Sequence, residues 1–367
     1  AVTMISRTTT ALIGRAAELR QLTEALDRLA AGQSKVIIIE AEAGEGKSRL
    51  MDEGRAIARD RGIRAFHGAA DAIETTTAYV AFRGLLSSLL GVDDVASAEA
   101  RGAVVRQRLA GRPELLARAP VLQDILALGL GETDETRGLE GEGRAAAVRA
   151  AVIELLSLET PLLVTVEDTQ WFDSASWALL QALASAVSPL LLIMTTRPVD
   201  AAAQSLEERE LRKRPHTALL RLGGLAPEYT AELVCARLGV DRVSEEVTRF
   251  IGGRTEGNAF FTEQLTLALR DSGLLEIADG RCTLRPGVDL AAEASVPNTI
   301  EGVVTQRIDR LSPTEQLSLK VASVVGRVFS AGVVNDIFPI AELKGRLPRE
   351  WPASQPGNPP TSPTPRA

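Results

Sequence analysis

The chain has 367 residues, enough for two or three domains. Its 48 acidic residues outnumber its 41 basic residues, and the net charge of −7 argues against a surface dominated by nucleic-acid binding. Two cysteines give no disulfide framework, and without a signal segment or an apolar run of about 20 residues we expect a cytoplasmic protein with no membrane partner.

Helical and strand patterns alternate in the first half of the chain. Leucines spaced three and four residues apart predict a helix over 16–31. Short apolar runs predict strands at 35–40, 65–69, 162–167 and 190–196, and further helices are expected at 49–61, 78–91, 100–128, 144–158 and 174–187. An acidic, glycine-rich stretch over 129–143 predicts a loop. Strands that alternate with helices indicate a parallel sheet covered on both faces.

A glycine-rich loop follows the first strand directly, where residues 41–48 read AEAGEGKS. A strand, such a loop and then a helix are the context that a phosphate-binding loop (P-loop) requires. Backbone N–H groups of Gly44 to Ser48 can surround a phosphate, Lys47 can reach the β- and γ-phosphates, and the Ser48 hydroxyl can ligate Mg²⁺. The alternative is an ordinary turn before a helix. The residues expected to bind nucleotide here are Ala43, Gly44, Glu45, Gly46, Lys47, Ser48 and Arg49.

Two adjacent carboxylates, Glu167 and Asp168, close the strand at 162–167. In a P-loop ATPase one such acid holds Mg²⁺ and the other orients the attacking water. Arg197 ends the next strand, where it can sense a γ-phosphate at the carboxyl edge of the sheet. We expect catalysis from Lys47, Glu167, Asp168 and Arg197, and metal binding by Ser48, Glu167 and Asp168. The alternatives are turn residues for the acids and a surface role for Arg197.

The strand pattern ends after Pro198. The second half predicts helices at 203–213, 227–238, 244–252, 259–273, 299–311 and 313–325, with a small hairpin around Asp279-Gly280. The basic run 212–214 is expected to be a solvated helix end. Seven of the 18 prolines fall within 348–367, which predicts a disordered tail.

Several motifs together resemble the STAND class of signal-transduction ATPases with numerous domains, which includes bacterial LuxR-type large regulators and ATPases fused to adenylate cyclase domains. The matching segments, in the order of the class, are Leu12-Ile13-Gly14-Arg15, Glu167-Asp168-Thr169-Gln170-Trp171-Phe172-Asp173, Thr196-Arg197-Pro198, Gly257-Asn258-Ala259-Phe260-Phe261, Val296-Pro297-Asn298-Thr299-Ile300 and Val325-Gly326-Arg327-Val328-Phe329. The chain departs from the class at three positions. Ala41 stands where the class has Gly, Gly224 where the class often has Pro, and Ala259 where the class has Pro.

The resemblance implies an α/β P-loop NTPase with a parallel sheet, followed by an all-helical lid and a partial winged-helix domain. It places a flexible lead-in at 1–11, the ATPase domain at 12–199, the lid at 200–293, the partial winged-helix domain at 294–338 and the proline-rich tail at 339–367. It also implies that Ile13 and Arg15 lie near the adenine and the phosphates. The bottom-up alternative for that segment is a loop packed on the sheet.

The resemblance further implies an ATP-binding regulatory switch of a multidomain signalling protein, with ATP or ADP and Mg²⁺ as cofactors and slow, regulatory ATP hydrolysis. Expected partners are signal or effector domains in cis or trans and, depending on nucleotide, a second copy of the chain; no direct nucleic-acid contact is expected from this part. Two alternatives stay open: a metabolic P-loop kinase, and a scaffold that binds nucleotide without turnover.

Overall fold

A computed structural model describes residues 12–200, 204–288, 299–309 and 311–325, which form two compact units. The first unit comprises Leu12–Ala226 and Gly257–Phe260, so it continues past the boundary expected at residue 199. The second comprises Pro227–Glu256 and the described residues from Phe261 onward. The lead-in expected at 1–11 and the tail expected at 339–367 lie outside the described residues, so both stay predictions.

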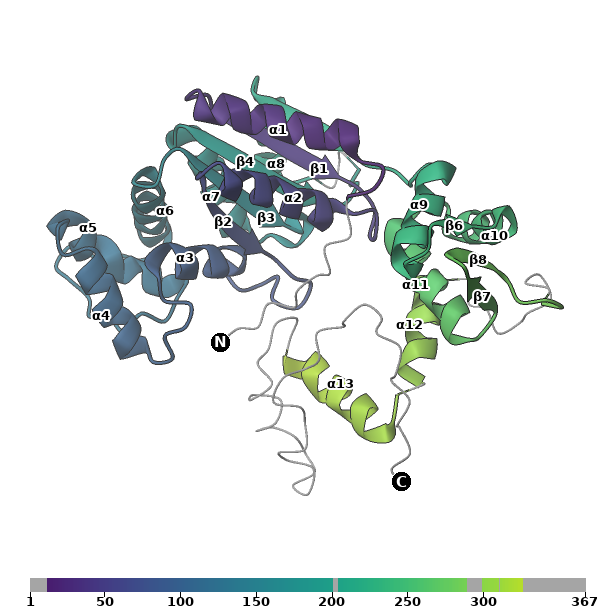
Figure 1. The fold of residues 1–367 in the computed structure, drawn as a ribbon. Helices are drawn as coiled ribbons and strands as arrows, with labels where there is room; N and C mark the ends of the chain where they lie inside the picture. The colour runs from purple at the N-terminus through teal and green to yellow at the C-terminus, as the bar shows by residue number, and fades with distance from the viewer. Residues whose placement is uncertain (1–11, 201–203, 289–298, 310, 326–367) are drawn as a thin grey trace, which may run out of the picture. The chain divides into compact units, whose positions relative to one another are not determined.

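A five-stranded parallel sheet organises the first unit, as predicted (Figure 1). Its strands stand in the order β2-β3-β4-β1-β5. Their bounds are β1 Lys35–Glu40, β2 Arg64–Ala69, β3 Leu162–Glu167, β4 Leu190–Thr196 and β5 Thr217–Arg221. Strand β5 was not predicted from the sequence. This edge strand pairs only with β1 among the described strands, and Leu219 is 40% exposed, so it lacks the continuous apolar run of a buried strand.

Eight helices of the first unit are described, at α1 Ala16–Ala30, α2 Lys47–Asp60, α3 Arg83–Leu90, α4 Ala98–Arg108, α5 Pro113–Arg118, α6 Gly141–Ser157, α7 Ser174–Ala186 and α8 Leu206–Lys213. Short 3₁₀ turns lie at η1 Val80–Phe82, η2 Ala119–Asp124 and η3 Thr169–Trp171. The helical region expected over 100–128 is divided into α4, α5 and η2. Pro113 has no N–H to continue a helix, and it stands in the first turn of α5, where that N–H is not needed.

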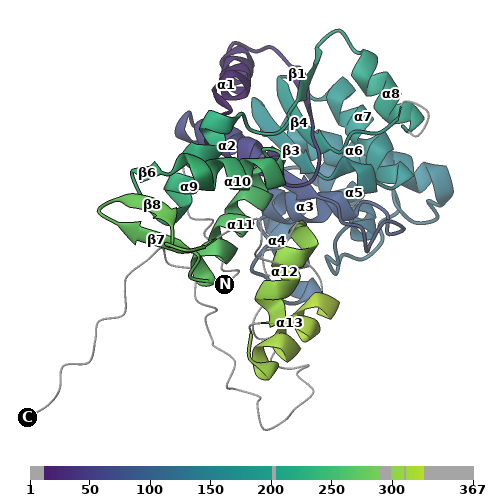
Figure 2. The ribbon, with the colours of Figure 1, turned by 90° about the vertical axis from the view of Figure 1, so that its right-hand side faces the viewer.

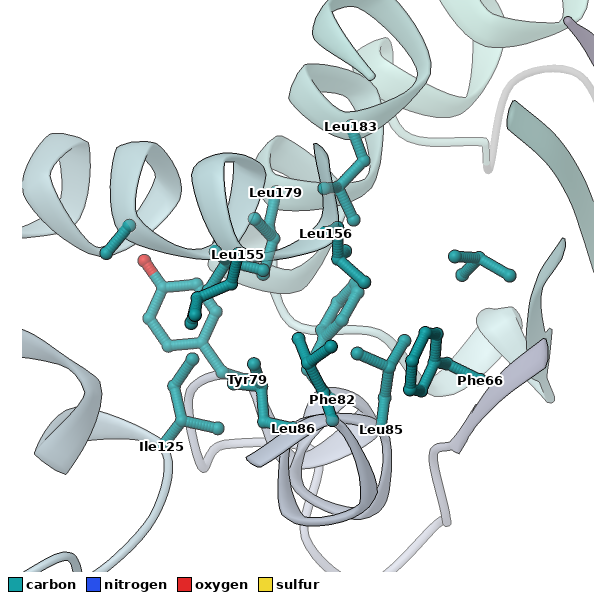
Figure 3. Packing of buried hydrophobic residues seen from close by; sticks show 14 of the residues in the cluster. Phe66, Tyr79, Phe82, Leu85, Leu86, Ile125, Leu155, Leu156, Leu179 and Leu183 are labelled. Atoms are coloured by element: carbon teal, nitrogen blue, oxygen red, sulfur yellow. The ribbon is translucent and has the colours of Figure 1, made fainter. Parts of the chain in front are cut away.

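Each face of the sheet buries its own apolar cluster. Ile37 and Ile39 on β1 pack with α1 and α2, whereas Val36 and Ile38 face the larger cluster that α3, α6 and α7 build. Figure 3 shows leucines and aromatic rings from several elements meeting in that larger cluster, among them Phe66 of β2. Alternate side chains of β1 are therefore buried on both sides, which fixes its register in the sheet.

A buried ion-pair network lies where β1 ends. The Arg212 guanidinium contacts the Glu40 carboxylate at 2.9 Å and the Glu208 carboxylate at 2.7 Å, and Arg221 reaches the other oxygen of Glu40 at 3.1 Å. The side chain of Arg212 is only 17% exposed. The expectation of a solvated helix end was therefore wrong for Arg212, although Lys213 beside it is 72% exposed.

Arg212→Met is expected to lower the free energy of unfolding by about 3–5 kcal/mol, because it leaves Glu208 and Glu40 without a buried cation. Urea denaturation followed by circular dichroism measures the loss. Lys213→Met, on the next residue of the same helix, is the matched control and should change the free energy by less than about 1 kcal/mol. Equal losses in the two variants would show that the network does not stabilise the fold.

The second unit is mainly helical, with α9 Pro227–Leu238, α10 Glu245–Thr255, α12 Ile300–Asp309, α13 Pro313–Val325 and most of α11 Ala259–Asp271. Its small sheet has the order β6-β8-β7, from β6 Arg242–Val243, β7 Leu275–Ala278 and β8 Arg281–Leu284 (Figure 2). The predicted hairpin around Asp279-Gly280 is confirmed as β7 and β8. Strand β6 was missed because two residues carry no periodic signal.

The apolar cluster of this unit includes Val234, Ile251, Leu265, Cys282 and Val303. The partial winged-helix domain stays a prediction, since α12 and α13 are described but residues 326–338 lie outside the described part. None of the described helices is long and apolar enough to cross a membrane.

Candidate functional site

The loop between β1 and α2 has the backbone shape of a P-loop. Gly44 and Gly46 adopt φ angles of +86° and +92°, which other residues rarely adopt. Gly46 is the residue just before α2, and within the described part of the chain no side chain caps this helix. The first N–H groups of α2 are therefore available to an anion at the positive end of the helix dipole.

Lys47, the first residue of α2, is buried, and its ammonium group turns back onto the loop. It donates to the carbonyls of Ala41 and Glu42 at 2.7 and 2.9 Å. Burial lowers the pKa of Lys47 below its usual value, the nearby Asp168 carboxylate opposes that shift, and Arg197 adds to it. The charges of Asp168 and Arg197 therefore act on the same ammonium group, although they follow different strands.

Ser48 and Glu167 join the P-loop to the end of β3. The Ser48 hydroxyl donates to Glu167 Oε2, and Glu167 Oε1 lies 3.7 Å from Nε2 of His67 on β2. A hydroxyl and a carboxylate in contact are oxygen ligands of the kind that Mg²⁺ prefers. The described residues contain no cluster of three metal-binding side chains. This donor set fits Mg²⁺, which commonly keeps water and substrate phosphate as its other ligands.

Asp168 lies at the first turn after β3 and has a φ of +58°. Its backbone N–H donates to the Thr195 hydroxyl at 3.1 Å, and its carboxylate accepts from the Gln170 amide at 3.2 Å. Arg197, just past β4, is exposed, and its backbone N–H donates to the side-chain amide oxygen Oε1 of Gln170 at 3.3 Å. The predicted residues Asp168 and Arg197 are thus joined through Gln170, for which the sequence motif alone predicts no separate role.

Arg15 is buried, and its guanidinium donates hydrogen bonds to backbone carbonyls. It donates to the carbonyl of Glu45 in the P-loop at 3.2 Å and also to that of Gly223 after β5. The structure therefore places Arg15 against the P-loop main chain. Ile13 is buried as well, and the Arg49 guanidinium lies 3.6 Å from Glu53 one turn along α2.

The segment Gly257–Phe260, predicted to belong to the lid, lies in the first unit against the P-loop. The Asn258 side chain donates to the carbonyl of Ala43 at 2.8 Å, and the Phe260 N–H donates to that of Gly44 at 3.0 Å. A Cβ built on Gly44 would lie 2.5 Å from Asn258 Oδ1, so the close approach depends on glycine. This contact joins residues far apart in sequence, and no local pattern predicts it.

Asp173, the last acid of the motif at residues 167–173, makes hydrogen bonds that hold the local fold. Its carboxylate caps α7 by accepting from the Ser176 N–H at 2.9 Å, and it also accepts from the Tyr79 N–H at 3.2 Å. A cavity of about 280 Å³ lies at the opposite, amino-terminal end of β1 and β5, beside Lys35 and His216. The cavity is therefore separate from the P-loop, which follows the other end of β1.

Two family models match parts of this sequence. A family model described as an AAA ATPase domain matches residues 11–194, half of the chain. The chain belongs to the AAA ATPase domain family. A model for a domain of unknown function matches residues 227–283, within the second unit. The AAA ATPase domain thus covers the P-loop, β3 and most of β4, and the P-loop ATPase domain predicted from the motifs is confirmed.

The chain is also similar to curated proteins and to solved structures. Adenylate cyclase type 10 of Oryctolagus cuniculus is 21% identical over 377 residues, covering 91% of this chain and 23% of that protein. The chain therefore spans about a quarter of the length of the curated relatives it matches first. A STAND protein with a tetratricopeptide repeat sensor from Pyrococcus horikoshii has a TM-score of 0.43 and 15% identity, covering 88% of this chain and 37% of that one. The Aeropyrum pernix ORC2 protein, solved as ADPNP-ADP complexes, has a TM-score of 0.42 and 17% identity, covering 92% and 83%.

Lys47→Ala is expected to weaken ATP binding at least tenfold, because a hydrogen bond to a charged group contributes about 1.5–3 kcal/mol. Isothermal titration with ATP and Mg²⁺ measures the affinity. Lys35→Ala, at the other end of β1, is the matched control and should bind ATP like the unmodified chain. Unchanged ATP affinity in the Lys47 variant would contradict the site.

Proposed function

We propose that this chain is the ATP-binding and ATP-hydrolysing regulatory switch module of a multidomain signalling protein, linked to a transcriptional regulator or an adenylate cyclase. The observation that carries the proposal is the meeting of the P-loop with the carboxyl end of β3, where the Ser48 hydroxyl donates to the Glu167 carboxylate. The AAA ATPase domain supports nucleotide binding, and so does the ORC2 relative solved with ADPNP and ADP.

In this proposal Lys47 exchanges its bonds to the Ala41 and Glu42 carbonyls for oxygens of the β- and γ-phosphates. Ser48 and Glu167 would hold Mg²⁺, which would supply positive charge to neutralise the phosphates. Asp168 orients the attacking water, and the exposed Arg197 side chain reaches the γ-phosphate.

The switch acts through contacts that differ between ATP and ADP. A ligand shifts a conformational equilibrium only through differential contacts with the two states, and the γ-phosphate provides such a difference at Arg197. Asn258 and Phe260 donate hydrogen bonds to P-loop carbonyls, so a change in the loop would be transmitted to the start of α11. Signal or effector domains, in cis or trans, and nucleotide-dependent self-association would then read the change. Winged-helix character in the region 294–338 and a cytoplasmic location remain part of this proposal.

Two other functions fit the AAA ATPase domain and make different predictions. A metabolic kinase would transfer the γ-phosphate to a small acceptor and release little free phosphate without it. A scaffold would bind ATP and release no phosphate with or without additions. Phosphate release from ATP alone, in the presence of Mg²⁺, favours the switch over both.

Glu167→Gln and Asp168→Asn are each expected to lower the rate of ATP hydrolysis at least tenfold, because the acids act on Mg²⁺ and water and not in the apolar core. Steady-state phosphate release measures the rate. Asp173→Asn is the matched control from the same motif. It should lose up to about 1 kcal/mol of stability as a weakened helix cap, with an unchanged rate where the protein is folded. If only Asp173→Asn slows hydrolysis, the roles assigned to Glu167 and Asp168 are wrong.

A further inference from the structure

We propose that Gln170 is a positioning residue that holds the Asp168 carboxylate and the Arg197 main chain as one unit, so that Asp168 responds to the γ-phosphate. This inference rests on the proposed function. Its basis is the side-chain amide of Gln170, which makes one hydrogen bond through its nitrogen and another through its oxygen. Nε2 donates to Asp168 Oδ1 at 3.2 Å, and Oε1 accepts from the Arg197 N–H at 3.3 Å. A side-chain amide supplies a donor and an acceptor together, as this bridge requires.

The bridge lies where backbone pairing between β3 and β4 has ended. The last paired residues are Val166 and Met194. Beyond them the Asp168 N–H donates to the Thr195 hydroxyl, and the Thr169 hydroxyl donates to the Thr195 carbonyl, both at 3.1 Å. These two hydrogen bonds connect the main chain that follows β3 to Thr195 of β4, and the side chains of Thr169 and Thr195 are both buried. Gln170 adds a bond to a carboxylate oxygen, which is the group that has to be aimed at the reaction.

The two residues that Gln170 joins carry opposite charges beside the same cation. Asp168 raises the pKa of Lys47 and Arg197 lowers it, although burial remains the larger effect on this pKa. A displacement of the chain after β4 toward a γ-phosphate would move the Arg197 N–H, and the amide would carry that movement to Asp168. ADP lacks the γ-phosphate, so the amide would leave Asp168 where it is. Gln170 thereby contributes to the distinction between ATP and ADP.

The test uses the whole chain and two substitutions of this residue. Gln170→Leu removes both hydrogen bonds at similar size. Gln170→Glu keeps the acceptor for Arg197 but replaces the donor by an oxygen that faces the Asp168 carboxylate. Gln181→Leu, a half-buried glutamine on α7, is the matched control. Unfolding midpoints show that each variant is folded at the temperature of the assay.

Both Gln170 variants are expected to lower kcat at least about tenfold with ADP affinity changed by less than about twofold, because the residue acts on the reacting state. The preference for a non-hydrolysable ATP analogue over ADP should fall about fivefold or more, the lower end of typical allosteric coupling. Combining Gln170→Leu with Asp168→Asn should slow hydrolysis no further than Asp168→Asn alone, because the amide acts through that carboxylate.

Three results would overturn the inference: an unchanged kcat in both Gln170 variants, equal losses of affinity for ADP and for the ATP analogue, or fully multiplicative effects with Asp168→Asn. A chain that binds nucleotide but does not hydrolyse it would overturn the proposed hydrolysis. In that case the ratio of the two affinities decides the inference: a ratio reduced in both Gln170 variants and kept in Gln181→Leu supports it, and an unchanged ratio overturns it.

Discussion

Burial of β1 on both faces is the constraint on which the site depends. Its side chains alternate between two apolar clusters, and β4 and β5 pair with it on either side. The strand can neither slip by one residue nor turn over without exposing one of these sets. The P-loop begins where this strand ends, so the position of Lys47 is determined by packing that lies outside the site.

Charge at the carboxyl edge of the sheet follows from this packing. Glu40, the last residue of β1, is neutralised by Arg212 and Arg221 away from the P-loop, whereas Glu42 and Glu45 remain within it. Glu45 is used locally, because its carboxylate accepts from the Glu42 N–H at 2.7 Å. Lys47 thus lies among acids that oppose the lowering of its pKa by burial, which helps to keep the ammonium form beside the loop. A phosphate would strengthen the same preference.

The sequence was sufficient to predict the parts of this fold that depend on local pattern. Strands β1, β3 and β4 are continuous apolar runs, and Glu167 and Arg197 were found because they stand at or just beyond strand ends. Strand β5 was missed because an edge strand carries a weak pattern. The pairing of Arg212 with Glu40 and the contact of Asn258 with Ala43 were missed because each joins distant segments. Gln170 belongs to the motif that was noted in the sequence. Its bridging role could not be predicted, because it depends on the positions of Asp168 and Arg197 in space.

Hydrogen exchange with and without nucleotide tests most directly whether phosphates bind at the carboxyl edge of the sheet. With MgADP, backbone amides of residues 44–50 should exchange more slowly, because those N–H groups would bond to phosphate oxygens. A non-hydrolysable ATP analogue should add protection at 168–171 and at Arg197. The opposite end of the sheet, residues 34–36 and 216–217, should exchange as in the nucleotide-free chain. Saturating nucleotide that protects only that opposite end, and leaves 44–50 unchanged, would contradict the account.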